Sequence, residues 1–287
     1  MSELDKQQFP KQHQNHQPGI ESEMSPRPIY KKETGIGCGK LKNKVAIITG
    51  GDSGIGRAIA VAFAQEGADV SIIYLNEHND AEDTKKIIEK IGRRCLLISG
   101  DVRNENFCKK AVKKTIDKFE HLHILINNAG EIHLQDSIED ISKEQLEKTF
   151  KTNVFSMFYM TKAAIRYLMS GSSIVNTASI AAYQGDSTLI DYSASKGAVV
   201  SFTRALSANL VSKGIRVNGV APGPIWTPFI PSFLSTEEIP NFGDNVAMGR
   251  AGQPVEIAPS YVFLASEDSS YMTGQILHPN GGEIVNG

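Results

Sequence analysis

Residues 45–56 have the sequence V-A-I-I-T-G-G-D-S-G-I-G. The apolar run at its start predicts a buried strand, and the pattern over residues 53–66 predicts a helix that ends at Gly67. Three glycines between strand and helix allow a tight turn and let a pyrophosphate approach the free N–H groups of the helix. They are Gly50, Gly54 and Gly56. This context predicts a dinucleotide site, and a purely structural turn is the alternative.

Strand-like and helix-like segments alternate along the rest of the chain. Further strands are predicted at residues 69–74, 95–99, 124–126, 173–178, 215–220 and 275–278. Helices are predicted at residues 81–91, 106–119, 142–168 with a break, 192–212 and 254–265. This alternation predicts an α/β fold of the Rossmann type, a doubly wound and mostly parallel sheet in a single domain.

Two segments stand apart from this pattern. Residues 1–40 are rich in proline and polar residues, so they form either a disordered tail or an extended arm. The expected anchors of such an arm are Pro18, Met24, Pro26, Pro28 and Tyr30. The domain itself is expected to span residues 41–287. Within it, residues 222–252 form a long irregular stretch with several aromatic residues, as expected of a functional lid.

Composition excludes several classes of protein. The chain has 287 residues, a formal net charge of −2 and ordinary apolar content, which indicates no nucleic acid or membrane partner. Its three cysteines are widely spaced, so neither disulfides nor a metal site is expected. No apolar run approaches the roughly 18 residues that a membrane span needs. The amino terminus lacks an apolar signal core, so a cytoplasmic protein is expected.

A candidate acid–base pair lies in residues 179–196, S-I-A-A-Y-Q-G-D-S-T-L-I-D-Y-S-A-S-K. Tyr192 and Lys196 are four positions apart, so they share one face of a predicted helix. A free phenol has a pKa of about 10, and a nearby ammonium is expected to lower it. Such a phenol would exchange protons near neutral pH, although an ordinary helix face with a packed lysine stem is the alternative.

Polar and small residues follow two other predicted strands. Asn127-Asn128-Ala129-Gly130 follows one strand and Asp101-Val102 another. Because ligands bind at the carboxyl ends of strands in open α/β sheets, both sets are candidate cofactor contacts. Asp101 either accepts from an adenine amino group or caps the next helix.

Taken together, these motifs resemble the classical short-chain dehydrogenase/reductase family. The matching features are T-G-G-D-S-G-I-G at 49–56, Asp101, N-N-A-G at 127–130, Asn153, Ser179, Y-S-A-S-K at 192–196 and P-G-P at 222–224. They occur in the family's order over nearly all of the chain after residue 40. The amino-terminal arm resembles that of a bacterial subgroup that includes general-stress-type dehydrogenases. The resemblance implies a seven-stranded parallel sheet and a homotetramer.

The resemblance also implies roles for individual residues. Tyr192 would be the acid–base group, and Lys196 would lower its pKa and bind the nicotinamide ribose. Ser179 would hydrogen-bond the substrate oxygen, and Asn153 would hold a water in a proton relay. The implied cofactor contacts are Gly50, Asp52, Ser53, Gly54, Ile55, Gly56, Tyr74, Leu75, Asn76, Asp101, Val102, Asn128, Ala129, Gly130, Tyr192, Lys196, Pro222, Gly223, Ile225 and Thr227.

The choice between NAD and NADP depends on the end of the second strand. An acidic residue there favours NAD, whereas arginine or lysine favours the 2′-phosphate of NADP. This chain has Tyr74-Leu75-Asn76 at that position, with Glu77 one residue later, Asp52 in the glycine turn and Arg57 as a nearby cation. The preferred expectation is NAD, with NADP as the alternative.

The resulting prediction is an NAD(P)-dependent oxidoreductase that interconverts an alcohol and a ketone or aldehyde. One alternative is a sensor or scaffold that binds cofactor without turnover, and another is a redox-neutral dehydratase or epimerase of the same fold. The residues expected to shape the substrate pocket, 131–137 and 225–246, are largely apolar, which favours a neutral or hydrophobic carbonyl compound.

Overall fold

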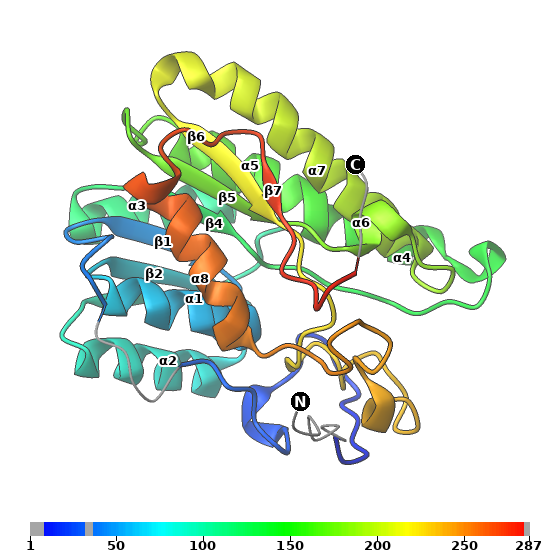
Figure 1. Ribbon diagram of the computed structural model, residues 1–287. Coiled ribbons are helices and arrows are strands. Elements are labelled where there is room, and N and C mark those ends of the chain that lie inside the picture. Colours follow the sequence, from blue (N-terminus) through cyan, green and yellow to red (C-terminus); the bar gives the residue numbers. More distant parts are fainter. Residues whose placement is uncertain (1–8, 32–36, 284–287) are drawn as a thin grey trace.

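A single parallel sheet forms the centre of the computed structural model, which describes residues 9–31 and 37–283 (Figure 1). Its seven strands lie in the order β3-β2-β1-β4-β5-β6-β7. The strands are β1 (Val45–Thr49), β2 (Asp69–Tyr74), β3 (Cys95–Ser99), β4 (Ile124–Asn127), β5 (Ser173–Thr177), β6 (Arg216–Val220) and β7 (Ile276–Leu277). The order reverses between β1 and β4, as in doubly wound folds, and the predicted fold class is confirmed.

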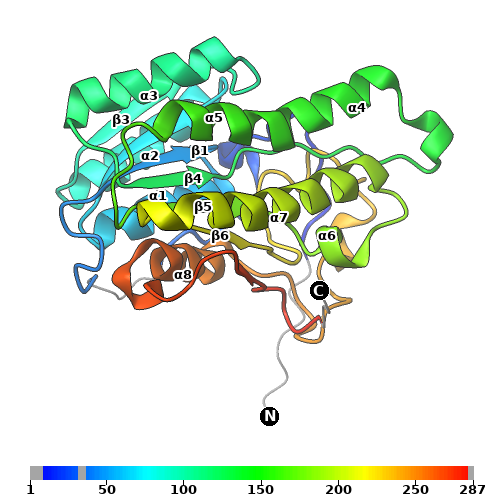
Figure 2. The ribbon, with the colours of Figure 1, turned by 90° about the horizontal axis from the view of Figure 1, so that it is seen from above.

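Helices cover both faces of the sheet. They are α1 (Gly54–Gln65), α2 (His78–Lys90), α3 (Glu105–Phe119), α4 (Lys143–Phe150), α5 (Ser156–Ala164), α6 (Ala181–Gln184), α7 (Ile190–Leu210) and α8 (Pro254–Ala265). Short 3-10 turns lie at Glu21–Glu23, Ile138–Asp140, Val211–Lys213, Ile239–Asn241 and Glu267–Ser269. Figure 2 shows α3 and α5 on one side of the sheet and α1 and α8 on the other.

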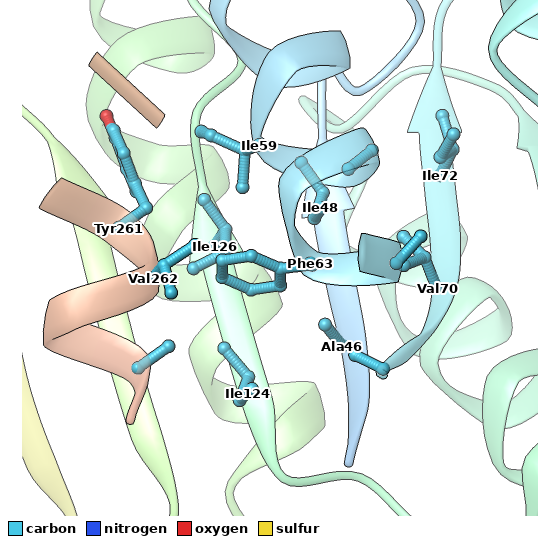
Figure 3. Close-up of a cluster of buried hydrophobic side chains, with 14 of the residues drawn as sticks. Ala46, Ile48, Ile59, Phe63, Val70, Ile72, Ile124, Ile126, Tyr261 and Val262 are labelled. Atoms are coloured by element: carbon cyan, nitrogen blue, oxygen red, sulfur yellow. The ribbon is translucent and has the colours of Figure 1, made fainter. Parts of the chain in front are cut away.

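The alternation of side chains along β1 explains these two layers. Ala46 and Ile48 pack with α1 and α8, whereas Ile47 between them packs with α3 and α5. All of these side chains are buried because successive residues of a strand point to opposite faces and both faces are covered. Figure 3 shows the first layer, in which Phe63 of α1 lies among strand residues and Val262 of α8.

The break expected in the long helical zone is a π-helical turn, Lys151–Phe155, which carries the buried Asn153. Helix α6 was not predicted, because it is a single turn after β5 and has no apolar periodicity. The irregular 222–252 segment is closed at its base by a β-bridge between Ile225 and Gly252.

The amino-terminal arm lies against the 222–252 segment (Figure 1). Phe9 stacks on Trp226, with ring centroids 3.8 Å apart and an interplanar angle of 8°. The indole Nε1–H donates to the carbonyl of Pro26 at 2.9 Å. The backbone N–H of Gln14 donates to the carbonyl of Pro231 at 2.6 Å. Of the expected anchors, Met24 and Pro28 are buried.

These contacts make Trp226, the only tryptophan of the sequence, a reporter of arm docking. Its side chain is fully buried and Phe9 covers one face of it. We expect Phe9→Ala to weaken arm docking by about 3 kcal/mol, the scale of losing a buried phenylalanine. Tryptophan emission should then shift to the red and be quenched more strongly by acrylamide. Phe155→Ala, which removes an exposed ring elsewhere, is the control; an unchanged Phe9→Ala spectrum would contradict the docked arm.

Candidate functional site

A cavity of about 730 Å³ lies along the carboxyl ends of the strands. Its wall includes residues that directly follow each of β1 to β5, together with Gln17, Pro18 and Gly19 of the arm and much of the 222–252 segment. This volume falls in the range of small-molecule sites. The cavity is lined by all of the predicted cofactor and catalytic residues except Asn76 and Asn153.

The glycine turn is held against the end of β4 by hydrogen bonds. The Thr49 hydroxyl accepts from the backbone N–H groups of Asn128 and Ala129 at 2.9 and 3.0 Å. The Asn128 amide donates back to the carbonyls of Thr49 and Gly50, both at 3.2 Å. A Cβ at Gly56 would lie 1.7 Å from the carbonyl oxygen of Gly50. Only glycine therefore allows α1 to begin so close to the turn.

The catalytic candidates converge at the other end of the cavity. Tyr192 and Lys196 of α7 are both buried, and the Tyr192 phenol hydrogen-bonds Ser179, which follows β5. The Lys196 ammonium lies 5.5 Å from the centre of the Tyr192 ring and donates to the carbonyl of Thr177 at 2.9 Å. The structure thus places phenol, ammonium and hydroxyl in one site.

The expected lowering of the Tyr192 pKa is wrong for this structure. Burial raises the pKa of Tyr192 to about 12, with a smaller opposing effect from the Ser179 hydrogen bond. Burial also lowers the pKa of Lys196 to about 8. Burial dominates both pKa shifts, and the Lys196 ammonium donates its hydrogen bond to the Thr177 carbonyl. At neutral pH the phenol therefore holds its proton and can donate it.

Asn153 supports this site from behind. Its side-chain amide donates to the carbonyl of Glu131 and to the Ser195 hydroxyl, both at 3.0 Å. Its oxygen accepts from the backbone N–H of Glu131 at 2.8 Å. A Cβ built on Gly130 would lie 3.3 Å from that oxygen and 3.6 Å from the Lys196 nitrogen. The Asn153 oxygen and the Lys196 nitrogen thus both border the space that a side chain at Gly130 would occupy.

At the opposite end of the cavity, Asp101 is engaged by Arg103. Its carboxylate accepts from the backbone N–H and the guanidinium of Arg103 at 2.8 and 2.7 Å. The cap of α3 is Asn104, whose side chain accepts from the backbone N–H of Phe107. The capping alternative for Asp101 is therefore wrong, because the helix begins later than that role requires.

Of the residues at the end of β2, Tyr74 and Leu75 line the cavity, whereas the exposed Asn76 does not. Glu77 is buried and lines the cavity, as does Asp52 of the glycine turn. Burial and the charge of Glu77 raise the pKa of Asp52 to about 6. This end of the cavity is therefore acidic.

Sequence reasoning missed a buried cluster beside the acidic end. Glu21 of the arm accepts from the backbone N–H of Gly54, the first residue of α1, at 2.7 Å. It also forms an ion pair with Arg57, and its own N–H donates to the Asp80 carboxylate at 2.7 Å. Burial raises the pKa of Glu21 to about 7 despite the Arg57 charge. Nothing in the periodicity of the arm marks Glu21 as an inward-facing residue.

Within residues 9–31 and 37–283, no cluster of three or more histidine, cysteine or acidic side chains is placed to hold a metal ion. The three cysteines are free thiols, two of them buried. No helix among the described segments has the length and apolarity to cross a membrane.

Comparisons with known proteins place this fold and site in a family. A family model described as enoyl-(acyl carrier protein) reductase matches residues 50–283. The chain therefore belongs to the short-chain dehydrogenase/reductase family, and it is an oxidoreductase of that family.

Two curated relatives and one solved structure are especially informative. General stress protein 39 of Bacillus subtilis (strain 168) is 59% identical over 97% of each chain. The glucose and ribitol dehydrogenase of Daucus carota is 49% identical over 98% of each chain. A short chain dehydrogenase from Burkholderia cenocepacia J2315 in complex with NADP is 31% identical, with a TM-score of 0.80, 85% of this chain covered and 98% of that one.

The buried Glu21 predicts an unusual pH dependence of stability. Since its pKa rises on folding from 4.5 to about 7, its contribution is fully present below pH 4.5 and is lost as the pH rises through 7. This group alone should lower the free energy of unfolding by about 2–3 kcal/mol between about pH 5 and pH 8. Denaturant unfolding of wild type and Glu21→Gln across this range measures it.

Only the difference between the two proteins reports on Glu21, because other groups titrate in both. The variant should show a correspondingly smaller loss of stability on going from acid to alkaline buffer. Parallel curves for the two proteins would contradict the raised pKa. The exposed Glu23→Gln on the same arm should leave the curve unchanged.

Proposed function

We propose that the protein transfers hydride between a nicotinamide dinucleotide and a neutral alcohol or carbonyl compound. The observation that carries the proposal is a buried phenol, Tyr192, that lines one cavity together with Ser179, Lys196 and the glycine turn. The cavity extends from this phenol to the acidic end at Glu77. The close approach at Gly56 provides the narrow cradle that a pyrophosphate needs.

The cofactor, when bound, supplies the hydride. The chain supplies the proton and stabilises charge on the substrate oxygen. Tyr192 donates its proton to the developing alkoxide, and its hydroxyl and that of Ser179 hydrogen-bond the same oxygen. Lys196 lies behind the phenol and stabilises the phenolate left after transfer. In the oxidative direction Tyr192 accepts the proton from the alcohol.

The preferred cofactor in this proposal is NAD. Asp52 and Glu77 line the cavity at the end opposite Tyr192, where the adenosine ribose would lie. Carboxylates accept hydrogen bonds from a ribose diol and repel a 2′-phosphate. The Burkholderia protein in complex with NADP is 31% identical to this chain, and its cofactor is not assigned to this protein.

The substrate in this proposal is uncharged and partly apolar. Ile132, Leu189 and the Tyr192 ring form one buried cluster, and Leu134, Phe229 and Phe233 pack against it. All of them line the cavity. Desolvating a charged substrate against this surface would be costly, whereas an aldehyde, ketone or alcohol is accommodated.

We further propose that residues 1–40 serve as an arm of the catalytic domain, 41–287, and that the protein is a homotetramer. Exposed aromatic side chains support self-association: Phe155 and Phe158 are both more than 40% exposed. Phe158 and Phe202 lie 4.3 Å apart between ring centroids and join the surfaces of α5 and α7. Sedimentation velocity at several concentrations tests the assembly.

Replacement of the Tyr192 hydroxyl tests the catalytic role. We expect Tyr192→Phe to lower kcat by about 10²–10⁴-fold, the range for loss of a general acid. Binding of NADH, followed by its fluorescence, should persist because the glycine turn is unaltered. Activity is measured by the absorbance of reduced nicotinamide over a panel of alcohols, aldehydes, ketones and sugars, with NAD and NADP in parallel.

Tyr167→Phe, which removes a phenol that does not line the cavity, should retain wild-type kcat. Near-full activity of Tyr192→Phe would refute the assigned role. Dinucleotide binding without turnover of any compound would favour a sensor, and product formation without net cofactor consumption would favour a redox-neutral reaction.

A further inference from the structure

Glu21 is the point at which the arm enters the dinucleotide region. The residue lies in a 3-10 turn, and its side chain is 1% exposed. One carboxylate oxygen accepts from the N–H of Gly54 in the glycine turn, and the other pairs with Arg57 one turn along α1. Residues 17–19, just before it, line the cavity itself.

Arg57 of α1 is the cation of that helix near the acidic end of the cavity. Neighbouring groups hydrogen-bond its guanidinium and balance its charge. Its Nε–H donates to the carbonyl of Asp52 at 2.9 Å and to the Thr84 hydroxyl at 2.7 Å. Its terminal nitrogens contact the Glu21 carboxylate and, at 3.4 Å, that of Asp80. A buried guanidinium is thus balanced by two buried carboxylates, one of which comes from the arm.

This balance of charges determines the electrostatic potential near the adenosine ribose, where NAD and NADP differ. Asp52 and Glu77 line the cavity there, and Arg57 contacts the backbone of Asp52 from behind. If Glu21 were absent, Arg57 would offset part of their negative charge. With Glu21 present, the charge of Arg57 is balanced and no longer offsets that of Asp52 and Glu77. NADP differs from NAD in that region by a phosphate of up to two negative charges.

We propose that Glu21 of the arm is a specificity-determining residue that excludes the 2′-phosphate of NADP by neutralising Arg57. This inference rests on the proposed function and adds to it the residue through which the arm selects the cofactor. Glu21 acts at a distance, through Arg57, and does not itself line the cavity.

The effect should be large enough to measure. Charges of a buried cluster interact through an effective dielectric of about 20, so the loss of one carboxylate near the 2′-phosphate should change its binding measurably. At about pH 8, where Glu21 is ionised, we expect Glu21→Gln to shift the ratio of NADPH to NADH dissociation constants about tenfold towards NADPH. Nucleotide fluorescence measures both constants without turnover.

Two controls separate this role from a structural one. Glu23→Gln removes an exposed carboxylate of the same turn and should leave the ratio unchanged. Arg57→Met removes the charge that lowers the pKa of the buried Glu21, so Glu21 should then be protonated and adding Glu21→Gln should give no further shift towards NADPH. Trp226 emission, which reports arm docking, should match the wild type in Glu21→Gln.

The experiment distinguishes failure of the proposed role of Glu21 from failure of the proposed function. Binding of neither dinucleotide by the wild type would overturn the proposed function. Wild-type binding with an unchanged ratio in Glu21→Gln, while Trp226 stays buried, would overturn the role of Glu21. A shift of similar size in the Arg57→Met background would also overturn it, because the effect would then not pass through Arg57.

Discussion

The hydrogen bonds between Thr49 and the end of β4 are the constraint on which the site depends. They hold the glycine turn beside Asn128 and Ala129 at the point where the strand order reverses. Because one hydroxyl accepts two backbone N–H groups, the two halves of the crevice are fixed relative to each other. Gly56 then lets α1 begin against this junction. The cavity therefore exists before any ligand binds, which reduces the entropy lost on binding.

Burial determines the chemistry at both ends of that cavity. At one end it keeps the Tyr192 phenol protonated and makes the Lys196 ammonium easier to deprotonate. At the other it raises the pKa of Asp52 and Glu21, although Arg57 opposes the effect on Glu21. At Glu21 the desolvation cost exceeds the attraction of the Arg57 charge. The same low-polarity environment strengthens the interactions of those charges with a ligand.

Most of the fold could be predicted from the sequence because short-range patterns specify it. Strands Asp69–Tyr74 and Cys95–Ser99 and helix Pro254–Ala265 have the predicted bounds, since apolar runs and a proline at the first turn mark them locally. The glycine turn and Asn127-Asn128-Ala129-Gly130 were found because they follow predicted strands, whereas most other site residues came from the family resemblance. Long-range packing was not accessible. The burial of Glu77 in place of Asn76, the insertion of Glu21 and the sign of the Tyr192 pKa shift all depend on which distant segments exclude water.

The contacts of the arm also constrain the order in which the chain can fold. Pro26 hydrogen-bonds a tryptophan 200 positions later, and Ile29 pairs with Gln253 and Val255. A ribosome releases the arm first, at roughly 5–20 residues per second, so its binding surface emerges tens of seconds after it. Because the arm is rich in proline and polar residues, it cannot form a core on its own before the segment that binds it has been synthesised. The arm is thus synthesised well before the segment against which it packs.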